Sequence, residues 1–190
     1  MFNENAKSTD LTVASVSAGV GAKERIGAGG VFHFKCFDKD GNLKWEDTAH
    51  NLVVNEGLKD MNDKYFSGSG YSATWYLGLV NNSPSPTYAA GDTLASHATW
   101  NETTDYSGNR KAVTFCAATL ADPSVISNSA SPASFSITGT VTVAGAFLAS
   151  VATGTSGILF SVSSFQSPGA RSVVSGDTLS VTYQFSLDAA

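Results

Sequence analysis

The chain has 190 residues, of which 42% are hydrophobic and 14% are charged, and its formal net charge at neutral pH is −5. Soluble proteins commonly carry about 25% charged residues. In this chain serine, threonine and glycine make up for the missing charged residues. A net negative chain does not attract the phosphate backbone, so nucleic-acid binding is not expected. The length suits one β-sandwich with additional segments.

The first residues, Met1–Lys7, are polar and do not lead into the apolar segment of a signal peptide. No apolar run reaches the roughly 18 residues that a membrane-spanning helix needs. We therefore expect a soluble protein that is made in a cytoplasm and has no membrane partner. In that compartment Cys36 and Cys116 are expected to stay reduced rather than to form a disulfide.

Residues 1–30 carry no strong periodicity and are rich in glycine, which predicts an extended N-terminal arm ahead of a single domain over residues 31–190. Two interpretations stay open. The arm is a flexible terminus, or it becomes ordered on a neighbouring subunit, with Leu11-Thr12-Val13 adding a strand to that subunit's sheet. Its candidate contacts are Lys7, Leu11, Val13, Lys23 and Arg25.

The first clear strand pattern covers residues 31–37 and resumes over residues 43–47, with an Asp-Gly turn between them. Asp-Gly between alternating segments predicts a β-hairpin, because glycine accepts the positive φ of the turn. A calcium loop is the alternative, and it requires glycine at its sixth position and an acid at its twelfth. Counted from Asp38, Gly41 is fourth and Ala49 is twelfth, so the hairpin is favoured.

One helix is predicted over residues 56–66. Asn55 is the expected N-cap, and Leu58, Met61 and Tyr65 follow at helical spacing. Glu56 in the first turn and Lys64 in the last turn suit the helix dipole.

A strand over residues 75–80 is followed by a long polar loop that continues to Trp100. A loop of this length inside a compact domain usually has a function. We therefore take the stretch from Thr87 to Trp100 as a second candidate contact surface. Its named candidates are Thr87, Tyr88 and Trp100.

The rest of the chain is strand and turn, with the clearest alternation over Leu179–Leu187. Further strands are predicted at 100–106, 111–116, 125–126, 135–137, 140–147 and 158–165, with a possible bulge at Gly145. Strands that recur every 8 to 12 residues or so indicate a sandwich or barrel. The predicted fold is therefore mainly β, an antiparallel β-sandwich of jelly-roll-like type with one short helix and the extended N-terminal arm.

The sequence does not predict an enzyme, a cofactor or a metal. It has no G-x-S-x-G motif, and its histidines and cysteines lack the spacing of zinc ligands. His33 lies three residues from Cys36, which places the two side chains on opposite faces of a strand. Paired carboxylates for sugar hydrolysis depend on approach in space and stay an open alternative.

Several segments recur in a characteristic order, and they include HNLVVNEGLKDMNDKYF, WYLGLV, AAGDTLASHATWNETTDYSGNRKAVTF, VAGAFLAS and RSVVSGDTLSVTYQFSL. Taken together, they resemble a family of small virion proteins of tailed bacteriophages, and the resemblance covers roughly residues 31–190. It implies a structural protein without enzymatic activity or cofactor. We infer from it a capsid decoration, or cement, protein on the virion exterior. Its partners would be the major capsid protein and other copies of itself, as a dimer or trimer.

A tail-associated or receptor-binding adhesion module is the alternative function. It would bind glycans through Trp45, Trp75 and Trp100, because tryptophan rings stack on sugars in lectin-like sandwiches. In strands of this kind, however, tryptophan more often belongs to the core.

Overall fold

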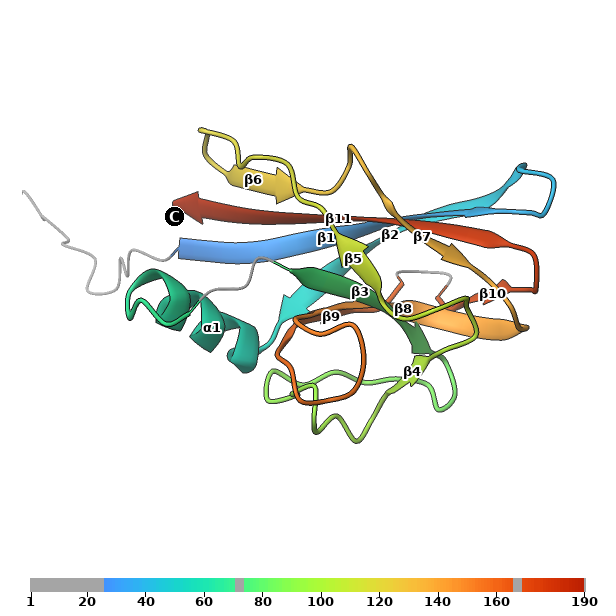
Figure 1. Ribbon diagram of the computed structural model, residues 1–190, viewed down its shortest axis with the longest axis horizontal. Helices are drawn as coiled ribbons and strands as arrows, with labels where there is room; N and C mark the ends of the chain where they lie inside the picture. The colour runs from blue at the N-terminus through green and yellow to red at the C-terminus, as the bar shows by residue number, and fades with distance from the viewer. Residues whose placement is uncertain (1–25, 71–73, 166–168, 190) are drawn as a thin grey trace, which may run out of the picture.

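The computed structural model describes residues 26–70, 74–165 and 169–189. This part of the chain forms one helix and eleven strands (Figure 1). The first elements are β1 (Ile26–Phe37), β2 (Leu43–Val53), α1 (Asn55–Tyr65) and β3 (Trp75–Asn81). They are followed by β4 (Asn101–Thr103), β5 (Lys111–Val113), β6 (Ser124–Ser127), β7 (Ala133–Ser136) and β8 (Val141–Ala149). The last elements are β9 (Leu159–Ser163), β10 (Arg171–Val173) and β11 (Thr178–Ala189).

The strands form two antiparallel layers that are connected through β2. One layer contains β2, β1 and β11, with β6 and β7 pairing with β11, and the other contains β3, β8 and β9 with the shorter β4, β5 and β10. β2 pairs first with β1 and then, over residues 51–53, with β9 of the second layer. The predicted mainly β, antiparallel sandwich with one helix is confirmed, and its layering agrees with the jelly-roll-like description.

The alternating pattern of β1 and β11 builds the core between the layers. Phe32 lies opposite Tyr183, Phe34 opposite Val181 and Cys36 opposite Leu179, and all six are buried. Cross-strand partners point to the same face of a sheet, so this row covers the residues of the second layer. Those residues include Leu77, Leu79 and Leu148.

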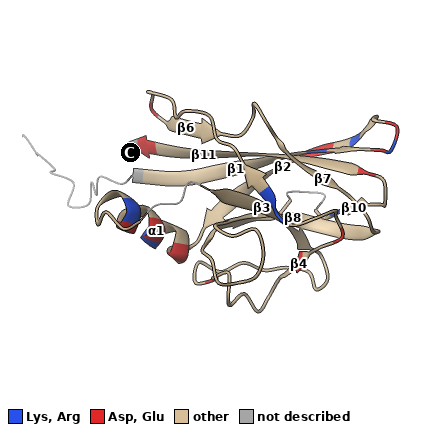
Figure 2. Ribbon diagram, viewed as in Figure 1, with Lys and Arg blue, Asp and Glu red and all other residues tan. Residues whose placement is uncertain are grey.

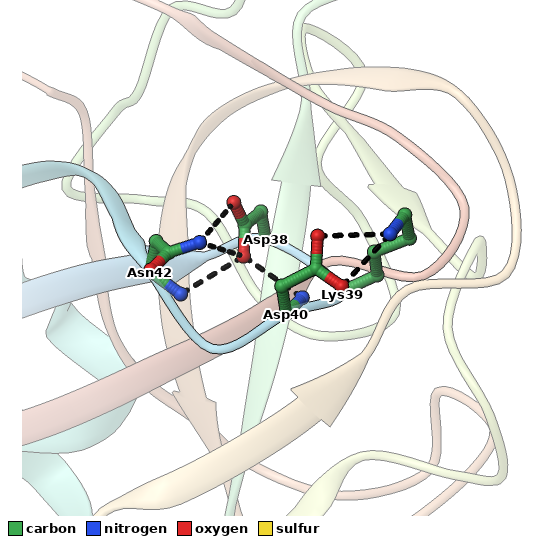
Figure 3. A network of polar contacts seen from close by, with 4 residues as sticks. All are labelled: Asp38, Lys39, Asp40 and Asn42. Atoms are coloured by element: carbon green, nitrogen blue, oxygen red, sulfur yellow. Dashed lines mark hydrogen bonds and ion pairs between the residues drawn. The ribbon is translucent and has the colours of Figure 1, made fainter.

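The β1–β2 hairpin forms where the Asp-Gly turn predicts it (Figure 3). The Asp38 carboxylate accepts hydrogen bonds from the backbone N–H groups of Asp40 and Asn42, at 2.9 and 2.8 Å, and from the Asn42 side chain. Gly41 has a φ of 84°, in the left-handed region that glycine adopts easily. The hydrogen bond from the Asn42 side chain lowers the pKa of Asp38. Asp38 closes the turn by accepting these hydrogen bonds.

The predicted irregularity at Gly145 is a β-bulge in β8. Val80 lies opposite Gly145, but Asn81 lies opposite Val143, so Ala144 is the additional residue. A Cβ atom at position 145 would lie 1.9 Å from the backbone oxygen of Ser163 in β9. Glycine is therefore required here by the close approach of two strands.

The helix forms as expected, but the predicted N-cap is wrong. Asn55 is the first helical residue and Val54 occupies the N-cap position, with no hydrogen bond from a capping side chain. Val54 is buried, and its N–H donates to the carbonyl of Phe160 at 3.2 Å. The start of the helix is thus set by the packing of the end of β2 on β9 rather than by a capping side chain.

The first strand begins earlier than the strand pattern of the sequence indicated. β1 begins at Ile26, so residues 26–30, which the sequence assigned to the arm, pair with β11. Their glycines obscured the strand pattern. At Gly30 a Cβ atom would lie 2.7 Å from the backbone oxygen of Gln184 and 3.0 Å from the Tyr183 hydroxyl, so packing excludes a side chain there.

Candidate partner-binding surface

Arg110 is a buried charged residue, and its side chain is only 5% exposed. Its guanidinium donates to both carboxylate oxygens of Glu102, at 2.9 and 2.7 Å, and to the carbonyls of Val151 and Gly154. It also lies over the ring of Phe147. Because these partners occupy the guanidinium, Arg110 fixes the 151–154 loop rather than offering a charge to a ligand.

A second polar cluster joins the turn before β11 to the start of β2. The buried Asp177 carboxylate pairs with Lys44 and accepts the backbone N–H of Val174 at 2.9 Å. Cys36 lies beside it with its sulfur 3.9 Å from the carboxylate. Burial, together with the charge of Asp177, raises the pKa of Cys36 to about 11, so this thiol is not activated as a nucleophile.

The two cysteines are free, as predicted, and they lie in different environments. Cys36 is buried, Cys116 is exposed, and His33 lies on the exposed face of β1 opposite to Cys36. The arrangement therefore offers no cysteine–histidine pair for catalysis at Cys36.

Glu56 has a different role from the one that its helix position suggests. Its carboxylate accepts the backbone N–H of Leu94 at 3.3 Å and that of Leu159 at 2.7 Å. It thereby connects α1 to the long loop and to β9. The sequence predicted only an interaction with the helix dipole.

We expect Glu56→Ala to lower the free energy of unfolding by about 1–3 kcal/mol, because two backbone donors lose their acceptor. Glu56→Gln should cost less, because it keeps one acceptor oxygen. Denaturant unfolding measures both effects. The matched control is Glu46→Ala, which removes a carboxylate that is 63% exposed. Equal losses for Glu56→Ala and Glu46→Ala would contradict the proposed connection.

The long loop is packed on the body of the protein, and it covers Trp100. This residue is 1% exposed, its indole N–H donates to Asp92 at 3.1 Å, and the His97 ring stacks on it at 3.9 Å. Thr87 is exposed, whereas Tyr88 is half-buried and packs edge-on against Trp100. The prediction of Trp100 as a direct surface contact is therefore corrected. Trp100 is a core residue, because burial removes its apolar ring from water. Thr87 is exposed and remains a candidate contact.

The tryptophans do not form a platform for sugar stacking. Trp75 and Trp100 are buried, and Trp45 is half-buried with its ring packed edge-on against Phe165. A stacking platform requires an exposed aromatic face. The glycan-binding alternative therefore loses the residues on which it was based.

A shallow hollow of about 660 Å³ lies on β1 and β2, and its lining includes His33, Lys35, Glu46, Thr48 and His50. His33 Nδ1 is 3.3 Å from the Thr48 hydroxyl oxygen, and Lys35 lies 3.8 Å from Glu46. These are the cross-strand contacts of an exposed sheet face. Within the described residues, no group of three or more His, Cys, Asp or Glu is arranged to hold a metal ion.

Two adjacent aromatic residues at the end of α1 are largely exposed. Tyr65 is 83% exposed and Phe66 is 78% exposed, and their rings lie edge-on 4.9 Å apart. Leu58 on the same helix is 41% exposed. We call Leu58, Tyr65 and Phe66 the α1 apolar patch. Large exposed aromatic residues commonly mark protein-binding surfaces.

The α1 apolar patch was not found from the sequence, although a signal for it is present. Tyr65 and Phe66 are consecutive, and consecutive residues on a helix point about 100° apart. Both rings therefore cannot occupy one narrow buried face.

Figure 1 places α1 at the end of the molecule where β1 begins. Figure 2 shows that charges are sparse on the strands and gather on α1 and on the β1–β2 hairpin.

The sequence-predicted contacts of the arm lie outside the described residues. They are Lys7, Leu11, Val13, Lys23 and Arg25. The structure begins at Ile26, directly beside the C-terminal end of β11.

Three tyrosines, of which Tyr106 and Tyr183 are buried and Tyr88 is half-buried, are expected to make the fold less stable at alkaline pH. Burial raises the pKa of Tyr88 to about 12, and it raises the pKa values of Tyr106 and Tyr183 as well. A pKa that is higher in the folded state stabilises the fold below the unfolded pKa, and this stabilisation is lost as pH rises through the folded value.

We therefore expect the free energy of unfolding to fall as pH rises above about 10, the pKa of an unfolded tyrosine. Urea unfolding between pH 8 and 12 measures this decrease. Tyr183→Phe removes one of the three phenols and should make the decrease shallower. An unchanged pH dependence in this variant would contradict the assignment.

Comparison with known proteins adds no assignment: no family model matches the chain, and no curated protein or solved structure is significantly similar to it. Among the described residues, no helix is both long and apolar enough to cross a membrane.

Proposed function

We propose that the chain is a non-enzymatic virion protein that binds the outer surface of a phage capsid lattice and stabilises it. The sequence resemblance over residues 31–190 supports this function. The charged clusters of Arg110 and Asp177 have structural partners in the fold, so they do not point to catalysis. The single structural observation that supports a binding role is the exposed aromatic pair Tyr65–Phe66.

The binding surface in this proposal is the end of the molecule that carries α1. β1 begins at this end of the molecule, and α1, which carries the α1 apolar patch, lies at the same end (Figure 1). Aromatic side chains give a large contact area at a small cost in side-chain entropy. The low content of charged residues suits repeated contacts with a protein lattice, and the net charge of −5 does not favour contact with packaged nucleic acid.

The direct test is a binding assay with capsids that were purified without this protein. Saturable binding at a fixed ratio to the major capsid protein, with a higher temperature of capsid disruption, is the expected result. Absence of binding to capsids, together with co-purification with tails or binding to glycans, would overturn the proposal in favour of an adhesion module.

The α1 apolar patch makes a specific prediction within this test. We expect Tyr65→Ser combined with Phe66→Ser to weaken capsid binding about tenfold or more, because both rings lose their contact area. The thermal midpoint of the free protein should change little, since both side chains are exposed. Val174→Ser is the control, because it replaces a residue that is 41% exposed in the turn before β11. Equal affinities for the two variants would show that the patch is not the contact.

A further inference from the structure

Two of the chain's three histidines lie on one face of the β1–β2 pair, although they are far apart in the sequence. In the antiparallel register His33 lies opposite Thr48, and His50 lies opposite Val31. Cross-strand partners share a face of the sheet, and so do residues that are two apart on one strand. His33, Thr48 and His50 therefore all point away from the buried face, which carries Phe32.

This register makes His33 and His50 diagonal neighbours across the two strands. Diagonal neighbours in an antiparallel pair are roughly 7–8 Å apart, which is within the reach of aromatic side chains. An imidazole nitrogen binds a zinc ion at about 2.0–2.1 Å. Two imidazole rings that lean toward each other across this spacing can therefore hold one metal ion between their nitrogens.

Both rings are accessible to a ligand from solvent. His33 and His50 are exposed, and both line the shallow hollow of about 660 Å³ on β1 and β2. The third histidine, His97, is half-buried in a different part of the fold. Its ring stacks on Trp100, and its Nδ1 lies 3.0 Å from the Trp100 carbonyl oxygen. His97 is thus engaged in packing, whereas the two histidines of the hollow are not.

Thr48 orients the His33 ring for metal binding. His33 Nδ1 lies 3.3 Å from the Thr48 hydroxyl oxygen. When Nδ1 donates its proton to this oxygen, the neutral ring carries its free lone pair on Nε2, and a metal ion binds at that lone pair. Histidines that bind metals commonly donate their other ring N–H to such a partner, which fixes both the tautomer and the direction of the ring.

We propose that His33 and His50 form a binding site for one divalent transition-metal ion on the outer face of β1 and β2. Imidazole nitrogens suit Zn²⁺, Cu²⁺ and Ni²⁺, whereas Mg²⁺ and Ca²⁺ prefer oxygen ligands. Among the described residues no third His, Cys, Asp or Glu is arranged to complete the site, so water fills the remaining coordination positions. This inference does not depend on the proposed function.

Calorimetric titration of the full-length chain with Zn²⁺ tests the site. Every variant carries Cys116→Ser, because that exposed thiol is itself a potential metal ligand. We expect one Zn²⁺ per chain and no binding of Mg²⁺. His33→Gln and His50→Gln should each weaken Zn²⁺ binding about tenfold or more, since each removes one of the two protein ligands. His97→Gln is the matched control and should leave the affinity unchanged. Absence of binding, or equal affinities for the three variants, would overturn the proposal.

Electron paramagnetic resonance with Cu²⁺ supplies a second test, because its hyperfine pattern reports how many nitrogens bind the ion. In the Cys116→Ser background we expect two imidazole nitrogens, and only one after His50→Gln. Thr48→Val should weaken Zn²⁺ binding about tenfold, because the His33 ring loses the partner that orients it. Thr48→Ser keeps the hydroxyl and should restore the affinity. A single bound imidazole before His50 is replaced would overturn the two-histidine site, and equal affinities for Thr48→Val and Thr48→Ser would overturn the role of Thr48.

Discussion

Gly145→Ala is expected to lower the free energy of unfolding by about 3 kcal/mol or more, one of the largest losses for a single added methyl group in this protein. The new Cβ atom would lie 1.9 Å from the oxygen of Ser163 and 2.7 Å from its carbonyl carbon. Both atoms belong to the backbone of β9, so no side-chain rotation relieves the overlap.

The strands would instead have to separate, and this movement would disturb the hydrogen bonds around the bulge. The N–H of Phe165 donates to the carbonyl of Ala144 at 2.8 Å, and the Ser163 hydroxyl bonds to the backbone of Ala146. A loss of about 3 kcal/mol corresponds to a decrease of roughly 6–12 °C in the thermal midpoint for a domain of this size.

The matched control is Gly91→Ala, because a Cβ atom at Gly91 would meet nothing within 4 Å. The same methyl group should then change stability by less than about 1 kcal/mol. Calorimetry of the two variants separates the effect of the added atom from the effect of its surroundings. Similar midpoints for both variants would contradict the close approach of β8 and β9.

Arg110→Ala is the second change with a large expected effect, about 3–5 kcal/mol. It removes a guanidinium that satisfies the Glu102 carboxylate and the carbonyls of Val151 and Gly154 at the same time. Glu102 is only 21% exposed, so its charge would remain largely desolvated without its partner. Most of the loss comes from the groups that are left unpaired.

Three further variants test this explanation by denaturant unfolding. Arg110→Lys keeps the charge but not the planar fork, so an intermediate loss is expected. Combining Arg110→Met with Glu102→Gln should cost less than the sum of the two single changes, because the residues form one network. Lys39→Ala breaks a pair with Asp40 that is 76% and 62% exposed, and it should cost less than about 1 kcal/mol. Strict additivity at positions 102 and 110 would contradict the network.

The residues of the candidate surface show where sequence patterns reach their limit. Spacing placed Tyr65 on the apolar face of the helix, yet the structure exposes it together with Phe66. The length of the loop made Trp100 a candidate contact, yet Asp92 and His97 hold it in the core. Exposure at a helix end or in a loop depends on which neighbour covers the residue, and spacing along the chain contains no information about that neighbour.

A continuous apolar run determined the strand β3, alternation along the chain determined β8 and β11, and turn chemistry determined the hairpin turn that begins at Asp38. These signals arise from neighbouring residues. The bulge at Gly145 was also visible, since a glycine interrupts a strand locally. Only the tertiary structure decided the partners of Glu56, the N-cap at Val54 and the start of β1 at Ile26. Each of these depends on contacts between residues far apart in the sequence, and such contacts are fixed only when the two layers pack together.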